Sequence, residues 1–403
     1  MRKFNYEARD SKNNKTVKAT VQAETERDAA KVLIAQGYKP LTIREAESGS
    51  NIFERLSNRI TTKDKVVFTR QLSTLIGAGL PFSQSLHSLV DQTPNPRLRG
   101  IIQEIIASVE GGHSLHDSFI KYPEVFDKLF LALVAAGEAS GTLDEALQHI
   151  AAQQEKDAEI MGRIRGAMTY PVIVLFVIVG VLVFMLLTVV PQVEKLYKDL
   201  HQTLPFITQF IVGISRFITQ YWWIVLILTG ILLYLGVQYF RTDSGRRTLD
   251  IMKLNAPVFR GLFRRLYMAR FTRTGETLLK SGVSMLDMLS ISSESVNNSI
   301  ISAEIDNAAE KVKGGKDLSS ALGAEDDIPK LVPQMISIGE KSGRVDEMMG
   351  KTAKIYEEEL DEEIRAISTS IEPILMVVLA IVAGGMVAAI LLPIYGLVNT
   401  INV

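Results

Sequence analysis

The fold of this chain is decided by residues 171–190, which read PVIVLFVIVGVLVFMLLTVV and carry no charged side chain. A helix of about 20 apolar residues is long enough to cross a hydrocarbon layer of roughly 30 Å, so this run predicts a transmembrane helix. Residues 222–240 and 374–392 are likewise uncharged. We assign the second and third transmembrane helices to 222–240 and 371–392, and therefore expect a polytopic membrane protein.

The composition of the whole chain combines apolar spans with a large polar part. Of its 403 residues, 47% are hydrophobic and 22% are charged. The net charge is −1, from 44 Lys and Arg against 45 Asp and Glu, which gives no electrostatic case for binding nucleic acid. The chain has no cysteine, and this excludes disulfides, thiolate metal sites and cysteine nucleophiles.

Positive charges next to the spans predict which side of the membrane each connecting segment occupies. Residues 241–280 carry ten Lys and Arg against three acids, whereas residues 191–221 carry only three Lys and Arg. Because positive segments stay on the cytoplasmic side, 191–221 and the tail 393–403 are expected on the outer side of the membrane. The first residues, MRKFNYEARD, lack the apolar run of a signal peptide, so we expect the N-terminus in the cytoplasm.

The uncharged runs lack the ionisable side chains that proton relays and ion-coupled transporters use at membrane depth. This argues against transport. A membrane transporter or channel is kept as the alternative function, because three spans are compatible with one.

The sequence contains two copies of one unit. Phe-Thr-Arg at 68–70 recurs 203 residues later at 271–273, and Gly-Glu at 137–138 recurs 202 residues later at 339–340. One residue is therefore lost between these two landmarks. The same offset of 202 relates Pro171 to Pro373 and Pro191 to Pro393.

Each copy is predicted to be a cytoplasmic helical bundle followed by a span, with the bundles at 61–170 and 241–370. The span at 222–240 then returns the chain to the cytoplasm. Ahead of the bundles, alternating apolar residues and one short helical pattern predict a small ββαβ domain at 1–45, joined by a linker at 46–60. The expected fold class is mainly α, with three transmembrane helices.

The sharpest local signal is Gly-Glu-x-Ser-Gly, which occurs once in each copy. Its residues are Gly137, Glu138, Ser140 and Gly141 in the first copy, and Gly339, Glu340, Ser342 and Gly343 in the second. One interpretation is a helix–turn–helix corner, completed in the first copy by a capping box from Thr142 to Glu145. The other is that the two glutamates dock a partner or lock the two bundles together.

Two further features have a structural interpretation beside a functional one. The glycine pairs 111–112 and 314–315 predict turns, followed by Ser114 and Asp317 at positions suited to capping the next helix. The acidic run at 357–363 predicts a solvated helix face, or else a surface that receives basic residues of a cytoplasmic partner.

Residues suited to catalysis or to metal binding are scarce. We find no phosphate-binding Gly-x4-Gly-Lys-Ser/Thr, no His-Glu-x-x-His and no Gly-x-Ser-x-Gly. The pair Glu110 and His113 straddles a glycine turn, which argues against a shared metal ion. We therefore predict no catalytic residue, no cofactor and no metal, and we do not expect an enzyme.

This combination resembles the type II secretion system F family, the inner-membrane platform proteins of type II secretion and type IV pilus assembly. The resemblance covers essentially the whole chain. It is carried by the small N-terminal domain, the two helical units with their Gly-Glu-x-Ser-Gly motifs, and residues at the span boundaries. These are Tyr170, Pro171, Pro191, Glu372, Pro373 and Pro393, the last in Leu-Pro-Ile-Tyr.

The resemblance implies a non-enzymatic protein of the bacterial inner membrane that forms homo-oligomers. Its partners would be a cytoplasmic hexameric assembly ATPase, pilins or pseudopilins, and other inner-membrane assembly proteins. Some secretion-branch relatives hold calcium near the first Gly-Glu motif. Here the helix face that starts at Asp144 continues with Gln148 and Ala152, which favours the pilus branch.

Overall fold

The computed structural model describes residues 2–10, 16–23, 30, 38–45, 59–199, 206–257 and 259–401. They divide into two compact units. The smaller unit comprises residues 1–61 together with 94–98, and the larger comprises 62–93 and 99–403.

The N-terminal segment contains a three-stranded antiparallel sheet. Its strands are β1 (Arg2–Asp10), β2 (Thr16–Ala23) and β3 (Tyr38–Glu45), in the order β2-β1-β3, with an irregularity in the β1–β3 register after Glu7. The short helix expected between the second and third strands falls in 24–37, where only Ala30 is described. Most of the expected linker, 46–58, also lies outside the described residues.

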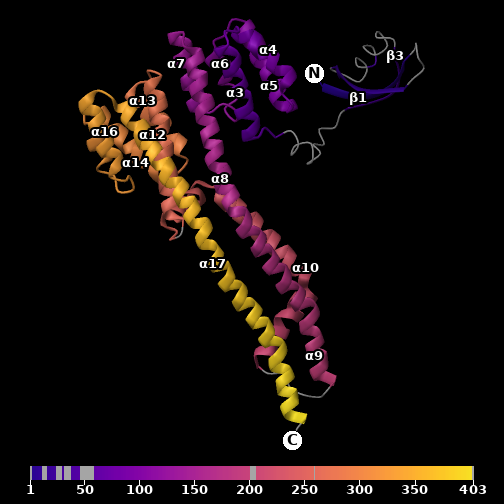
Figure 1. Ribbon diagram of the computed structural model, residues 1–403. Coiled ribbons are helices and arrows are strands. Elements are labelled where there is room, and N and C mark those ends of the chain that lie inside the picture. The colour runs from indigo at the N-terminus through magenta and orange to yellow at the C-terminus, as the bar shows by residue number, and fades with distance from the viewer. Residues whose placement is uncertain are drawn as a thin grey trace. The chain divides into compact units, whose positions relative to one another are not determined.

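Each copy of the repeat consists of six helices in the same order (Figure 1). In the first copy they are α3 (Thr62–Gly77), α4 (Phe82–Gln92), α5 (Pro96–Glu110), α6 (Leu115–Phe119), α7 (Lys128–Ser140) and α8 (Leu143–Phe184). In the second copy they are α12 (Arg260–Lys280), α13 (Met285–Val296), α14 (Ser299–Lys313), α15 (Leu318–Leu322), α16 (Leu331–Ser342) and α17 (Val345–Ile401). Helix α11 (Asp243–Asn255) precedes the second set.

The second copy is one residue shorter than the first, and its helices show where that residue is missing. Helix α7 has 13 residues and α16 has 12, whereas α4 starts at Phe82 and α13 starts 203 residues later at Met285. The buried residues Phe130, Val134 and Gly137 of α7 correspond to Val332, Ile336 and Gly339 of α16 at the offset of 202, whereas α6 and α15 start 203 residues apart, so the missing residue lies between α15 and Val332. Each bundle has its own apolar core, which contains Leu72, Phe119 and Phe130 in the first copy and Phe271, Leu289 and Ile305 in the second.

Three helices in the described part of the chain are long and apolar enough to cross a membrane. The first runs from α8 through a π-helical segment (Met185–Val189) into α9 (Val190–Asp199), the second is α10 (Phe206–Arg241), and the third is α17. Figure 1 shows α8 and α17 as long helices that extend beyond the shorter helices of the bundles. The last helix of each copy therefore joins its bundle directly to a span.

The segment 191–221, which connects the first two spans, is helical over most of its described residues. It is helical in α9 and again from Phe206, with residues 200–205 not described, and a break at Tyr221 (φ −117°, ψ 24°) precedes the expected second span. The four prolines at the expected span boundaries, Pro171, Pro191, Pro373 and Pro393, also lie inside continuous helices. Helices tolerate such prolines in membranes because neighbouring helices and local π-helical turns satisfy the freed carbonyl groups.

Candidate functional site

The two Gly-Glu-x-Ser-Gly motifs form matching corners, one between α7 and α8 and one between α16 and α17. Gly141 (φ 77°) and Gly343 (φ 70°) end α7 and α16 in the left-handed conformation that glycine adopts without strain. A Cβ atom on Gly137 would lie 2.7 Å from Ala146 Cβ, and one on Gly339 would lie 2.7 Å from Val345 Cα. Both corners therefore need glycine at their first position for close helix packing.

The glutamate of each motif binds the start of a short helix about twenty residues earlier in the chain. Glu138 accepts hydrogen bonds from the backbone N–H groups of Leu115 (2.9 Å) and His116 (3.2 Å) at the start of α6. Glu340 accepts one from Ser319 N (3.2 Å) at the start of α15, and the Ser319 hydroxyl donates to its other oxygen. A carboxylate is favoured there because the first amides of a helix have no partner within the helix.

The serines of the motifs bond locally. Ser140 and Ser342 donate their hydroxyl hydrogens to the carbonyl oxygens of Ala136 (2.7 Å) and Ile338 (2.8 Å), one turn earlier in their own helices. These contacts support the corner interpretation of the motif. The docking role of Glu138 and Glu340 stays a hypothesis. Glu138 is exposed and Glu340 is half-buried, so a partner could still reach both carboxylates.

Of the three predicted caps, Ser114 caps its helix through its side chain, Asp317 occupies the N-cap position of α15 without a side-chain bond, and the capping box at Thr142 is wrong. Ser114 accepts a hydrogen bond from Asp117 N (3.0 Å), as expected. Asp317 precedes α15 but accepts no such bond. The capping box at Thr142 does not form either, since the backbone there (φ −107°, ψ 44°) is not extended and the hydroxyl bonds to Ser140 Oγ at 2.7 Å instead.

We expect Gly339→Ala to destabilise the protein by about 1–3 kcal/mol, because the added methyl group would overlap backbone atoms of α17 that cannot move aside. Gly100→Ala is the matched control, since a Cβ atom at that helical position would meet nothing within 4 Å. Thermal unfolding of the purified full-length protein measures both changes. Equal midpoints for the two variants would contradict the close approach at Gly339.

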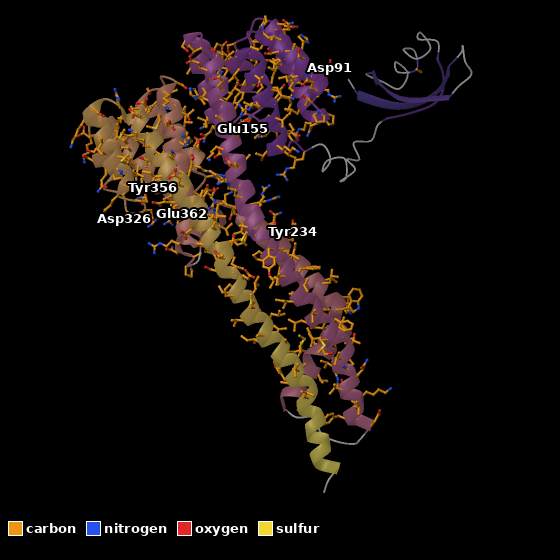
Figure 2. All side chains as sticks on the ribbon, viewed as in Figure 1. Asp91, Glu155, Tyr234, Asp326, Tyr356 and Glu362 are labelled. Carbon is orange, nitrogen blue, oxygen red and sulfur yellow. The ribbon has the colours of Figure 1, made fainter. Side chains whose placement is uncertain are left out.

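Each copy also contains the same arginine–glutamate pair. Arg70 on α3 contacts Glu155 on α8 through two nitrogens, and Arg273 on α12 contacts Glu357 on α17 through Nε (2.8 Å) and Nη2 (2.7 Å). Figure 2 labels Glu155 on α8. The repeat offsets relate the two arginines and the two glutamates, so charges that recur at the same offset are the sequence signal from which this pairing could have been predicted.

The acidic run at 357–363 is not a freely solvated face. Glu357 pairs with Arg273, and Glu359 and Glu363 both pair with Arg265 at 2.9 Å, while Asp361 pairs with Arg163. The basic residues that this run receives therefore come from the same chain. Glu358 and Glu362 are exposed, and Glu362 is labelled in Figure 2.

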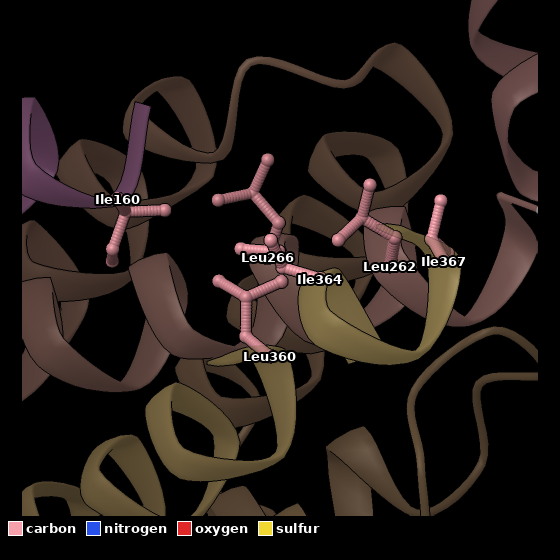
Figure 3. Close-up of a cluster of buried hydrophobic side chains, with 6 residues drawn as sticks. All are labelled: Ile160, Leu262, Leu266, Leu360, Ile364 and Ile367. Atoms are coloured by element: carbon pink, nitrogen blue, oxygen red, sulfur yellow. The ribbon is translucent and has the colours of Figure 1, made fainter. Parts of the chain in front are cut away.

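The first and second copies are joined where α8 meets α12 and α17. Ile160 of α8 belongs to one buried cluster with Leu262 and Leu266 of α12 and with Leu360, Ile364 and Ile367 of α17 (Figure 3). Lys156 lies 3.7 Å from Glu357 beside this cluster.

Burial raises the pKa of the nearby Asp157 carboxyl, and the Arg270 guanidinium opposes that rise. The joint therefore combines an apolar centre with charged groups at its edge.

No group of three or more histidine, aspartate or glutamate side chains is placed to hold a metal ion among the described residues. Asp144, near the start of α8, is exposed. The arrangement of the site is that of a structural corner with an exposed acidic side chain.

Two bundles of equivalent helices, each ending in a helix that is apolar enough to cross a bilayer, define a polytopic helical membrane protein. The sequence profile described as type II secretion system protein F matches residues 68–191 and again 271–393, and the profile of that protein's N-terminal domain matches residues 1–44. The chain belongs to the type II secretion system protein F family. The starts of the two matches are 203 residues apart and their ends 202, as the repeat predicts.

Relatives carry names from both branches of the family. The chain is 36% identical to the type IV pilus assembly protein PilC of Thermus thermophilus, with 99% of each chain covered. It is 34% identical to PilC of Pseudomonas aeruginosa over 91% of this chain and 98% of that protein. It is 31% identical to the type II secretion system protein F of the same organism, over 98% and 99%.

Proposed function

We propose that this chain is the inner-membrane platform of a machine that assembles type IV pili or type II pseudopili, and that it couples a cytoplasmic assembly ATPase to the addition of filament subunits. The observation that carries the proposal is similarity along nearly the whole length to proteins named for both processes. The slightly higher identity to pilus assembly proteins favours the pilus branch.

The architecture supports a mechanical rather than a chemical role. Because α8 and α17 run from the bundles into the spans, a displacement imposed on either bundle would move a transmembrane helix with it. The cluster around Leu360 and Ile364 would make the two copies move together, since separating them would expose buried apolar surface.

We place the bundles at 61–170 and 241–370 in the cytoplasm and the C-terminal tail in the periplasm. The charge bias of 241–280 supports this orientation. The N-terminal residues 1–45 would form a small ββαβ domain on the cytoplasmic side. Pilins or pseudopilins, other inner-membrane assembly proteins and further copies of this chain would be the remaining partners.

Deletion of the gene is expected to abolish surface pili or the secretion of exported enzymes, and a plasmid copy is expected to restore the lost process. Electron microscopy of the cell surface and assays of culture supernatants measure the two outcomes. Affinity purification of the restored protein from membranes is expected to recover a hexameric ATPase. Normal pili together with normal secretion in the deletion strain would refute the proposal.

A further inference from the structure

Helix α11 leaves the second span by a sharp turn. Helix α10 ends at Arg241, and Thr242 begins α11 by accepting a hydrogen bond from Gly245 N at 3.2 Å. A Cβ atom on Gly245 would lie 2.0 Å from the carbonyl oxygen of Tyr239, so the start of α11 folds back against the end of α10. The helix therefore begins at the depth where the second span ends.

The segment that follows α11 leads to a cluster that also contacts the start of the third span. The chain continues to Phe259, which packs against the buried cluster that contains Leu262 and Ile367. Ile371, at the start of the third span, packs against the same cluster. Helix α11, whose 13 residues extend about 20 Å, is therefore preceded by the second span and followed by a segment that packs on the same cluster as the start of the third.

One face of α11 is attached to the second bundle. Asp250 and Leu254 are buried, and Asp250 accepts a hydrogen bond from Ser299 N of α14 at 3.0 Å. Lys253 pairs with Asp250 at 3.0 Å, so that carboxylate is satisfied within the bundle. This attachment holds the helix in a single orientation.

Away from the attached side, α11 exposes apolar side chains, and Arg247 lies beside them, one turn before Ile251, while Arg246 lies at the edge of the attached side, one turn before Asp250. Ile251 is 43% exposed and Met252 is 59% exposed. Arg246 and Arg247 are exposed as well, and across the described part of the chain neither forms an ion pair. Apolar side chains in water combined with unpaired cations beside a membrane span are the features of an interfacial helix.

We propose that α11 is a membrane-surface anchor that binds the leaflet on the side of the bundles. Ile251 and Met252 insert among the acyl chains, and Arg246 and Arg247 bind the phosphates of anionic lipid headgroups. The occupant of this face is the bilayer surface, because the span is continuous with the helix and the charges are complementary to anionic lipid. The anchor sets the height of the second bundle above the membrane, whichever machine the protein serves.

Because the chain has no cysteine, a single reporter can be placed on this face. Met252→Cys carries a fluorophore, and Ile338→Cys is the control because Ile338 is 54% exposed on α16 of the same bundle. The full-length protein is reconstituted in nanodiscs that contain lipids with brominated acyl chains. We expect several-fold stronger quenching at position 252 than at position 338, and equal quenching at the two positions would overturn the proposal.

The headgroup contacts are tested in nanodiscs with and without anionic lipid. Quenching at position 252 is expected to be stronger with anionic lipid and to weaken at high salt, because salt screens the attraction between arginine and phosphate. Arg246→Gln with Arg247→Gln is expected to remove the difference between the two lipid mixtures. A difference that persists unchanged in this double variant would overturn the role of the arginines.

Discussion

Arg273→Met is expected to destabilise the protein by about 3 kcal/mol, whereas Arg70→Met is expected to cost less than about 1 kcal/mol. The two arginines occupy equivalent positions in the two copies and hold equivalent glutamates. Their environments differ, since the side chains of Arg273 and Glu357 are 27% and 10% exposed, and those of Arg70 and Glu155 are 55% and 35% exposed.

The asymmetry follows from what each substitution leaves behind. Loss of Arg273 leaves the Glu357 carboxylate buried, with Lys156 at 3.7 Å as its remaining cation, and a buried charge without a close partner is costly. Loss of Arg70 leaves Glu155 accessible to water, which hydrates it. Methionine keeps much of the volume of the arginine stem, so the loss reports mainly charged contacts. For Arg273 these include Glu276 at 2.7 Å, which keeps Lys280 at 2.7 Å as its partner.

Denaturant unfolding of the full-length protein measures both variants against the wild type. Glu357→Gln combined with Arg273→Met should recover part of the lost stability, because the double variant has no Glu357 carboxylate left buried without its arginine. Equal losses for Arg273→Met and Arg70→Met would show that burial does not determine the strength of the pair.

Reversal of charge at both corners, by Glu138→Arg with Glu340→Arg, is expected to abolish filament assembly while membrane insertion is retained. The substitution places a cation at the start of α6 and α15, where the helix dipole favours an anion, and it inverts the charge of the proposed docking surface. Surface pili and the amount of protein in the membrane fraction are the two measurements. Normal filaments from the double variant would refute the role of the corners.

Two further variants separate docking from folding. Glu138→Gln with Glu340→Gln keeps one hydrogen-bond acceptor at each helix start and removes only the charge. Ala139→Trp with Lys341→Trp adds bulk at exposed positions of the motifs without removing the glutamate–amide bonds. If the tryptophan variant assembles normal filaments while the arginine variant unfolds more easily, the corners are structural only.

Local patterns predicted the features that depend on neighbouring residues. An uncharged run such as 171–190 has few alternatives to a buried or membrane helix, and the three helices that are apolar enough to span agree with this. The glycines at 141 and 343 end helices as expected, because a positive φ is a local property of the backbone. The repeat could be recognised in the sequence because each copy is a complete unit of six helices, whose equivalent residues recur at a nearly constant offset.

Contacts between distant residues were not predicted. Thr142 fits a capping-box pattern, yet its hydroxyl bonds to Ser140, and the amides of α6 and α15 are satisfied by glutamates about twenty residues later in the chain. The acidic run has the pattern of a solvated face because its cations lie far away in sequence, with Arg163 198 residues from Asp361. Helix continuation through Pro191 also depends on neighbouring helices rather than on the local sequence.

The sequence by itself determined the spans, the duplication and the glycine corners, because hydrocarbon thickness, repeat offsets and backbone sterics act on short segments. Only the tertiary structure decided that Glu138 and Glu340 bind helix starts, that the acidic run holds the chain's own arginines, and that α11 has an attached face and an exposed face. These depend on which helices lie side by side. The choice is made by the burial of apolar clusters such as the one around Leu360, which no single segment specifies.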